Sequence, residues 1–252
     1  MQDDATMTPA AKSGLDSRTR FTQVSLFSAL LSGRYGGVIS VGELKKLGNM
    51  AIATMDRLDG EMQMIDGVVY QACADGHVYR PDDDATIPFG TIAEFRAERT
   101  VKLLDVPSYE EFEARMDALC HEENVPLAIH FTGAFGHMKV RAVARQERDG
   151  VGLAEAAKSE AVFELPNVHG DLVGFRLPGY VKGVNAPGWH LHFVDAERRC
   201  GGHVVNFSIQ EGELRCCNAN DFQIWLPDAA TLSGLNLARD WSDELKQAEA
   251  ER

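Results

Sequence analysis

The stretch Asn185-Ala-Pro-Gly-Trp-His-Leu-His-Phe-Val194 is followed by a charged segment and then by Cys200-Gly-Gly-His-Val-Val205. Two runs of apolar and aromatic residues on either side of a short polar segment are typical of two paired β-strands. The polar segment contains Glu197 and Arg198, where a turn would reverse the chain. The sequence therefore predicts a β-hairpin.

Three histidines lie on this predicted hairpin. Side chains alternate along a strand, so His190 and His192 share one face at a separation of roughly 7 Å. If the turn centres between Glu197 and Arg198, His192 lies opposite His203 on the returning strand. The apolar residues that alternate with His190 and His192 then face the core, namely Trp189, Leu191 and Phe193.

Three imidazoles on one patch favour a metal site. Neutral imidazole is the commonest protein ligand for metals, and catalytic Zn²⁺ takes three protein ligands while keeping a position for water or substrate. The chain has no C-x-x-C pair, so cysteine ligands are not expected. We therefore expect His190, His192 and His203 to bind Zn²⁺. The adjacent Gly201 and Gly202 indicate a bulge or a close approach of strands.

Composition narrows the class of protein. The 252-residue chain has a formal net charge of -13 and a pI near 5.0, whereas nucleic-acid binders usually present a basic face. DNA and RNA are therefore not expected as partners. No run of about 18 apolar residues is present, and the N-terminus lacks the order of a signal peptide, so we expect no membrane association and a cytoplasmic location. The odd number of cysteines, five, indicates reduced thiols.

The pattern along the chain favours an α+β (mixed α/β) fold. Residues 50–95 form short β-type runs with turn signals at Asp66-Gly67 and Asp75-Gly76, and β-type runs return after residue 127. Helices are expected over 21–31, 41–47, 108–120 (with Ser108 as N-cap), 153–162 and after Asp240. Strands and helices do not alternate regularly, so mixed or antiparallel sheets with flanking helices are expected.

We expect a flexible leader and two domains. Residues 1–20 are polar and aperiodic, which is typical of a mobile segment. A boundary near residue 160 separates an N-terminal α/β sheet domain, 21–160, from a C-terminal β-rich domain, 161–252. The second domain carries the metal-binding hairpin and the terminal helix.

Two glutamates are candidates for functional residues, although the sequence pattern alone does not distinguish them from surface acids. Glu61 follows a tight Asp59-Gly60 turn at the start of an apolar strand, where a carboxylate can be aimed at a site. An ordinary exposed strand glutamate would show the same pattern. Glu249 lies in the terminal helical segment and has the pattern of a helix-surface acid.

One of three cations on an alternating strand is a candidate for binding an anionic substrate. Lys139, Arg141 and Arg145 share one face, which is also the pattern of a solvated surface. A guanidinium binds a carboxylate through two parallel hydrogen bonds, so a small anionic substrate would favour an arginine. Periodicity does not choose among the three.

From about Phe21 to the C-terminus, the chain resembles the α-acetolactate decarboxylases. The resemblance rests on residues in family order and spacing: Gly174-Phe175, Pro178, Tyr180, Gly183, Asn185, Pro187-Gly188, His190-x-His192-Phe193 and Gly201-Gly202-His203. Three further segments agree: Thr54 to Glu61 with Leu58-Asp59-Gly60-Glu61, the Tyr35-x-Gly37 turn, and Pro88-Phe89.

The resemblance implies a two-domain fold with two sheets, a homodimer, and conversion of (S)-2-acetolactate, a small 2-hydroxy-3-keto acid, to (R)-acetoin and CO₂. Residue by residue, the zinc ligands of the family fall on His190, His192 and His203, its catalytic glutamates on Glu61 and Glu249, its arginine on Arg141, and an active-site threonine on Thr54. The implied chemistry passes through a metal-stabilised enediolate that is protonated on one face.

Two alternatives to this function stay open on the hairpin pattern. Cupin-like metal-dependent dioxygenases and isomerases also place His-x-His on a β-hairpin, and nitrogen-rich sites do not by themselves choose the metal. A non-enzymatic metal-binding domain, in which the histidines only brace the hairpin, is the other alternative.

Overall fold

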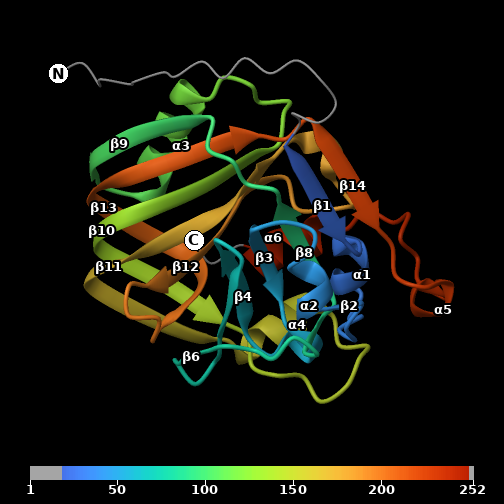
Figure 1. Cartoon of the computed structure of the whole chain (residues 1–252). Coiled ribbons are helices and arrows are strands. Elements are labelled where there is room, and N and C mark those ends of the chain that lie inside the picture. The colour runs from blue at the N-terminus through green and yellow to red at the C-terminus, as the bar shows by residue number, and fades with distance from the viewer. Residues whose placement is uncertain (1–18, 250–252) are drawn as a thin grey trace.

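The computed structural model describes residues 19–249, and the side chains of residues 19–245. Within these residues strands far outnumber helices, and the architecture is mixed α+β, as the sequence predicts. Two large β-sheets pack against each other, with short helices around them (Figure 1). Residues 1–18, most of the predicted leader, lie outside the described residues, whereas Arg20 begins strand β1.

The first sheet has seven strands in the described part of the chain, in the order β14 (Asp221–Trp225), β1 (Arg20–Val24), β8 (Phe89–Ala93), β3 (Met50–Thr54), β4 (Glu61–Ile65), β5 (Val68–Ala72) and β6 (Val78–Tyr79). Neighbouring strands are antiparallel except for β1 and β14. The predicted Asp66-Gly67 turn joins β4 to β5, and both residues have positive φ, 50° and 79°, as a tight hairpin requires. Strands β2 (Ile39–Ser40) and β7 (Thr86–Ile87) form a separate ribbon.

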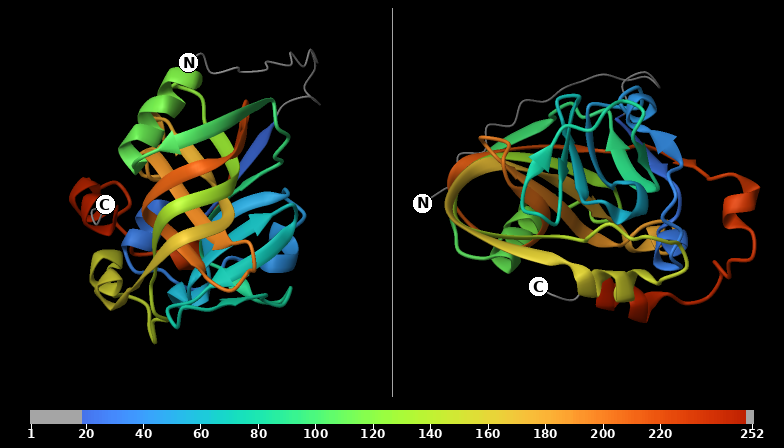
Figure 2. Two further views of the ribbon diagram at one scale, coloured as in Figure 1. Left: turned by 90° about the vertical axis from the view of Figure 1, so that its left-hand side faces the viewer. Right: turned by 90° about the horizontal axis from the view of Figure 1, so that it is seen from below.

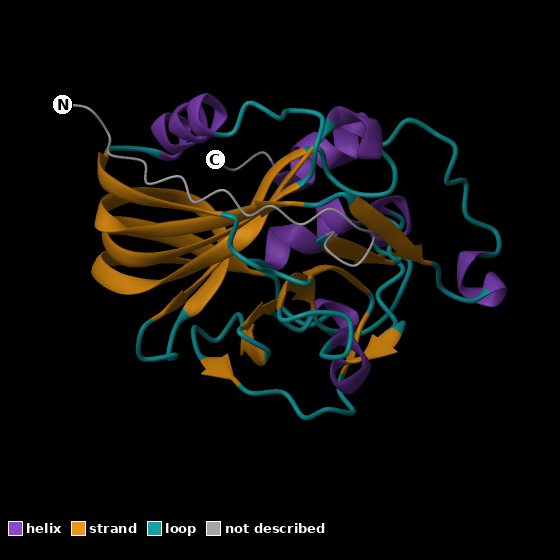
Figure 3. Cartoon of the chain, turned by 45° about the horizontal axis from the view of Figure 1, so that its top comes forward, coloured by secondary structure: helices purple, strands orange, loops and turns teal. Residues whose placement is uncertain are grey.

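The second sheet has five strands within residues 19–249, in the order β10 (Leu127–Ala142), β11 (Ala161–Leu177), β12 (Gly188–Asp195), β13 (Gly201–Asn218) and β9 (Arg99–Val106). Strand β13 also pairs with β10, so the sheet curves and closes on itself. Figure 3 shows this strong curvature. An aromatic core lies against these strands, where the ring of Phe135 meets those of Phe131, Phe193 and Phe207 edge to face at 5.2, 5.3 and 6.0 Å.

A second cluster of buried side chains joins the two sheets. It combines Phe21 and Ile52 of the first sheet with Val173 and Phe175 of the second. The rings of Phe21 and Phe175 meet edge to face at 5.0 Å. Burial of each such side chain contributes roughly 1.5–3 kcal/mol. This shared core fixes one sheet against the other and brings β4 into contact with β12.

Short helices surround the sheets: α1 (Phe27–Leu31), α2 (Val41–Leu44), α3 (Tyr109–Leu119), α4 (Leu153–Ala156), α5 (Ala229–Leu232) and α6 (Ser242–Glu249), with 3₁₀ turns at Asp56–Leu58, Ala157–Ser159 and Gly179–Val181. Helix α3 begins as predicted, because the backbone N–H of Glu111 donates to the Ser108 hydroxyl at 3.3 Å. Helix α6 lies beside α4 (Figure 2). Among the described residues, none of the helices has the length and apolar composition needed to cross a bilayer.

The helix predicted over residues 21–31 is wrong in its first half. Residues Arg20–Val24 form β1, which pairs with β8 on one side and with β14 on the other. Phe21 and Val24 are buried in different clusters on opposite faces of this strand, which produces apolar spacing that imitates a helix. The helix predicted over 153–162 likewise ends early, because β11 begins at Ala161.

The two sheets exchange strands across residue 160. Strands β9 and β10 precede that residue and belong to the second sheet, whereas β14 follows it and belongs to the first. The division of the chain into two folding domains at residue 160 stays a prediction.

Candidate metal centre

The hairpin of β12 and β13 has the predicted register. His192 pairs with His203, Phe193 with Gly202, and Val194 with Gly201. The turn is held by the buried carboxylate of Asp195, whose Oδ1 accepts from the backbone N–H groups of residues 199 and 200 at 2.6 and 3.0 Å. The local sequence alone therefore places His192 opposite His203.

The glycine pair before His203 allows a close approach of three strands. A Cβ atom on Gly201 would lie 2.3 Å from the carbonyl oxygen of Phe193 on β12. A Cβ atom on Gly202, whose φ is +152°, would lie 2.5 Å from the carbonyl oxygen of Arg141 on β10. Both distances are too short for any side chain, so glycine at these positions lets β13 lie close to β12 and β10 at the site.

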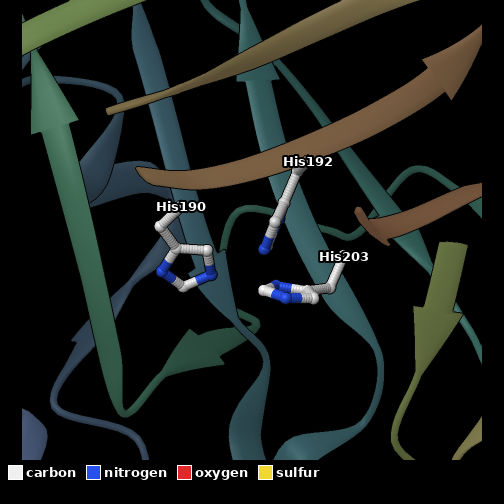
Figure 4. A group of neighbouring side chains, drawn as sticks. All are labelled: His190, His192 and His203. Carbon is white, nitrogen blue, oxygen red and sulfur yellow. The ribbon is translucent and has the colours of Figure 1, made fainter. Parts of the chain in front are cut away.

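The three histidines converge from two adjacent strands (Figure 4). One nitrogen from each of His190, His192 and His203 lies within 4.8 Å of the others. The ring centroids are 4.8 to 5.6 Å apart. The apolar residues of β12, Trp189, Leu191 and Phe193, point into the opposite core, as the alternation predicts. The cluster can hold one metal ion with three nitrogen ligands.

His192 has the protonation state that a metal ligand needs. Its Nδ1 lies 3.0 Å from the carbonyl oxygen of Met62 on β4, and since a carbonyl only accepts, Nδ1 carries the proton. Burial, with only 1% of the residue exposed, lowers the pKa of His192 well below its usual value, and the neighbouring His190 lowers it further. The Nε2 lone pair is buried and has no hydrogen-bond partner among the described residues. A metal ion bound there would satisfy it.

Glu61 lies against the histidine cluster. It begins β4, opposite Thr54 on β3, and its Oε2 is 3.7 Å from Nε2 of His192. Its side chain is 14% exposed. The hydroxyl of Thr54 donates to the carbonyl oxygen of Gly60 at 3.2 Å, and Gly60 has a φ of 88°. Thr54 therefore braces the tight turn that aims Glu61.

The structure separates Arg141 from the other two candidate cations. Arg141 pairs with His203 in the β10–β13 register, is 8% exposed, and lines the same pocket as the histidines. The side chain of Arg145 is 54% exposed and pairs with Asp59 on the surface. Lys139 is not among the residues that line this pocket.

The pocket has a polar floor and an apolar wall. The floor carries Thr54, Glu61, Arg141 and the three histidines. The wall is formed largely by α1, α4 and neighbouring segments: Phe27, Leu30, Ile52, Leu58, Phe89, Val143, Leu153 and Ala157. A small ligand with one anionic end and short alkyl groups matches this division.

The predicted residue Glu249 ends helix α6, and its side chain lies outside the described residues. Leu245, one turn earlier, packs against the cluster that contains Phe27 and Leu30 of the pocket wall. The backbone of α6 therefore runs close to this wall.

Glu160 was missed in the sequence. Its Oε2 accepts from Nη1 of Arg141 at 3.0 Å, and its side chain is 11% exposed. Glu160 directly precedes β11, and no local pattern there distinguishes a buried carboxylate from a surface one.

Comparison with known proteins assigns the chain to a family. The family model described as alpha-acetolactate decarboxylase matches residues 21–239, most of the chain. The chain belongs to the alpha-acetolactate decarboxylase family. It is thus an enzyme, a decarboxylase, as the resemblance of its motifs implies.

Relatives in this family match nearly the whole chain. The alpha-acetolactate decarboxylase of Methanosarcina mazei is 40% identical over 227 residues, which cover 90% of this chain and 79% of that protein. The alpha-acetolactate decarboxylase of Bacillus subtilis is 31% identical over 228 residues, covering 90% of this chain and 89% of the relative.

Solved structures of this family share the fold. The crystal structure of the Bacillus subtilis strain 168 enzyme superposes with a TM-score of 0.88, covering 91% of this chain and 99% of that one. A Staphylococcus aureus protein of unknown function similar to alpha-acetolactate decarboxylase is 28% identical and superposes with a TM-score of 0.86, covering 92% and 100% of the two chains.

Proposed function

We propose that this chain decarboxylates (S)-2-acetolactate to (R)-acetoin and CO₂, with Zn²⁺ held by His190, His192 and His203. The observation that carries the proposal is the position of Arg141 and Glu61 in one pocket with three converging imidazoles. The buried, unprotonated Nε2 of His192 supports a metal at this place. Family membership supports acetolactate as the substrate.

The reaction requires an electron acceptor next to the bond that breaks. Loss of CO₂ from a 2-hydroxy-3-keto acid leaves an electron pair on the former carboxyl-bearing carbon, and the neighbouring ketone must accept it. A bound Zn²⁺ supplies a Lewis acid for the ketone and hydroxyl oxygens. The three imidazoles are neutral nitrogen ligands, which leave the positive charge of such an ion largely uncompensated.

Arg141 binds the substrate carboxylate. A guanidinium forms two parallel hydrogen bonds to a carboxylate, which fixes both its position and its plane. Because Arg141 pairs with His203 across two strands, it holds the carboxylate beside the metal ligands. With the carboxylate turned out of the plane of the ketone, the breaking bond overlaps the π system. The reacting geometry is thereby set before bond cleavage.

Glu61 moves protons at the reacting carbon. Its carboxyl group lies at the floor of the pocket, 3.7 Å from Nε2 of His192, and a carboxyl there can donate a proton to one face of the carbon that has lost CO₂, which gives acetoin. The apolar wall takes the two methyl groups and excludes water from the other face. We propose Glu249 of α6 as the second catalytic glutamate, so that one of the two donates the proton that sets the stereochemistry.

We also propose a homodimer. Among the described residues, strand β14 lies at an edge of the first sheet, with β1 as its one neighbour. Around it Ile224, Trp225 and Leu226 are 41%, 42% and 59% exposed, an unusual set of apolar residues for a free edge. A second copy covering this edge would bury them. Sedimentation of the wild type and of Trp225→Asp tests the dimer, which the substitution should dissociate.

A cytoplasmic location is also proposed. All five cysteines lie within the described residues and are free thiols, which fits a reducing compartment.

One preparation tests the reaction. Metal content is measured by elemental analysis, racemic 2-acetolactate is added, and acetoin and CO₂ are followed with and without a chelator. Zinc near one per chain, and acetoin formation that is lost on chelation and restored by zinc, would establish the proposal. Bound iron with oxygen consumption and no acetoin would overturn it in favour of cupin-like chemistry.

A further inference from the structure

Behind the pocket, a buried carboxylate contacts the arginine of the site. Nη1 of Arg141 donates to Oε2 of Glu160 at 3.0 Å, and the two side chains are 9% and 11% exposed. Arg141 lines the pocket, whereas Glu160 does not. The carboxylate therefore contacts the guanidinium without itself lining the pocket.

The backbone holds Glu160 firmly in this position. Its N–H donates to the carbonyl oxygen of Ala157 at 3.0 Å, which closes the 3₁₀ turn Ala157–Ser159, and β11 begins at the next residue. Two residues further on, Val162 pairs directly with Arg141. Glu160 thus lies between a 3₁₀ turn whose first residue, Ala157, lines the pocket and a strand that is in register with the arginine.

We propose that Glu160 is a positioning residue that orients the guanidinium of Arg141 toward the substrate carboxylate, which rests on the function proposed above. An arginine side chain has several rotatable bonds, so its charged end needs a partner to select one direction. A charge-assisted hydrogen bond in a site with little solvent access is strong enough to select it. The same carboxylate stabilises the buried guanidinium when no substrate is bound.

Glu160 can act on Arg141 by orienting the guanidinium or by its negative charge. These two effects change KM differently, so two variants of Glu160 distinguish them. Glu160→Gln keeps an oxygen that accepts from Nη1 and removes the negative charge. It should leave KM near the wild-type value or lower it, because the negative charge of Glu160 no longer offsets the positive charge of Arg141. Glu160→Ala removes the acceptor, so it should raise KM at least about tenfold and lower kcat as well. If Glu160 had only a structural role, Glu160→Ala and Glu160→Gln proteins of equal thermal stability would have the same KM. A lower KM in Glu160→Gln at equal stability therefore indicates positioning.

The test compares the wild type, Glu160→Ala, Glu160→Gln and a matched control, Glu155→Ala. Glu155 lies five residues away, and its side chain is 64% exposed and forms an ion pair with Lys158 at the surface. Each protein is assayed for KM and kcat with 2-acetolactate, for zinc content, and for thermal stability. If Glu160→Ala does not fold, Glu160→Met takes its place, since methionine keeps the volume without a strong acceptor.

A second readout does not depend on turnover. Calorimetry measures the binding of 2-hydroxy-2-methylpropanoate, an unreactive hydroxy acid, and of its uncharged amide. We expect Glu160→Ala to weaken binding of the acid at least about tenfold and to leave the amide unchanged, with Glu160→Gln and Glu155→Ala close to the wild type. Equal affinities of Glu160→Ala and the wild type for the acid would overturn the role of Glu160. Wild-type protein that makes no acetoin would instead overturn the proposed function.

Discussion

The Nδ1 atom of His192 lies 3.0 Å from the carbonyl oxygen of Met62, so a backbone group of the first sheet fixes a candidate metal ligand of the second. The residue before Met62 contributes to the same relationship, since Oε2 of Glu61 lies 3.7 Å from Nε2 of His192. The candidate site therefore exists only where the two sheets meet. The packing of Phe21 against Phe175, which is the β11 partner of His190, helps to align the two sheets at this place.

Removal of one histidine should remove the metal. His203→Ala leaves only two nitrogen ligands on β12, and we expect zinc content to fall well below one per chain and turnover to fall at least about a hundredfold. His137→Ala is the matched control, because His137 lies on a neighbouring strand with a side chain 39% exposed and pairs with Glu164 at the surface. Elemental analysis of both variants, with turnover measured alongside, decides the matter. Full zinc content in His203→Ala would remove this residue from the site.

Substitution by lysine should have very different effects on kcat/KM at Arg141, on β10, and at Arg145, just after that strand. Arg141→Lys keeps a positive charge and loses bidentate geometry, so kcat/KM for 2-acetolactate should fall by about 10- to 100-fold. Arg145→Lys should leave it unchanged, because the Arg145 side chain is 54% exposed and pairs with Asp59 outside the pocket. Steady-state kinetics on both variants tests this. Equal effects of the two substitutions would mean that the carboxylate binds elsewhere.

The hairpin that carries the three histidines could be predicted from sequence because its geometry is local. Alternation of side chains and a turn of fixed centre are enough to place His192 opposite His203. Contacts between distant segments could not be predicted in this way. No pattern near residue 160 shows that Glu160 meets Arg141. Apolar spacing predicts a helix where β1 lies, because the strand partners β8 and β14 are far along the chain and leave no local signal. For Glu61 and Arg141, the resemblance to a family supplied the choice that periodicity left open.

Substitution of the two proposed catalytic glutamates should distinguish a loss of proton transfer from a loss of bound zinc. We expect Glu249→Gln to retain zinc and to lose most turnover, by about 10²- to 10⁴-fold, as removal of a general acid or base does. Glu61→Gln should cause a loss of similar size, with reduced zinc affinity if its carboxylate also contacts the metal. Glu244→Gln, another acid of α6, is a control. Turnover and zinc content are measured together, and unchanged turnover in Glu249→Gln would exclude that residue from the mechanism.

A buried hydrogen-bond network in the second sheet should make the free energy of unfolding depend on pH in the acidic range. Asp171 accepts hydrogen bonds from His130 and Thr132, both at 2.7 Å, and forms an ion pair with Arg198 at 2.6 Å. Burial opposes ionisation of Asp171, but the hydrogen bonds from these partners outweigh it and lower its pKa from 3.8 to about 2. A carboxylate whose pKa is lower in the folded than in the unfolded state stabilises the fold above the unfolded value, 3.8, and loses this contribution as the pH falls toward about 2.

Asp171→Asn should remove that contribution, which is on the order of 2 kcal/mol in the free energy of unfolding at neutral pH. Urea unfolding of the wild type and the variant, at about pH 7, 4 and 2.5, measures the difference between them. The difference should be largest at neutral pH, nearly as large near pH 4, and much smaller at the lowest pH, where Asp171 begins to be protonated in the folded wild type. Asp84→Asn, at an exposed position, controls for the general effect of removing a negative charge. A difference that stays constant down to the lowest pH would show that Asp171 stabilises the sheet through packing of its side chain and not through its charge.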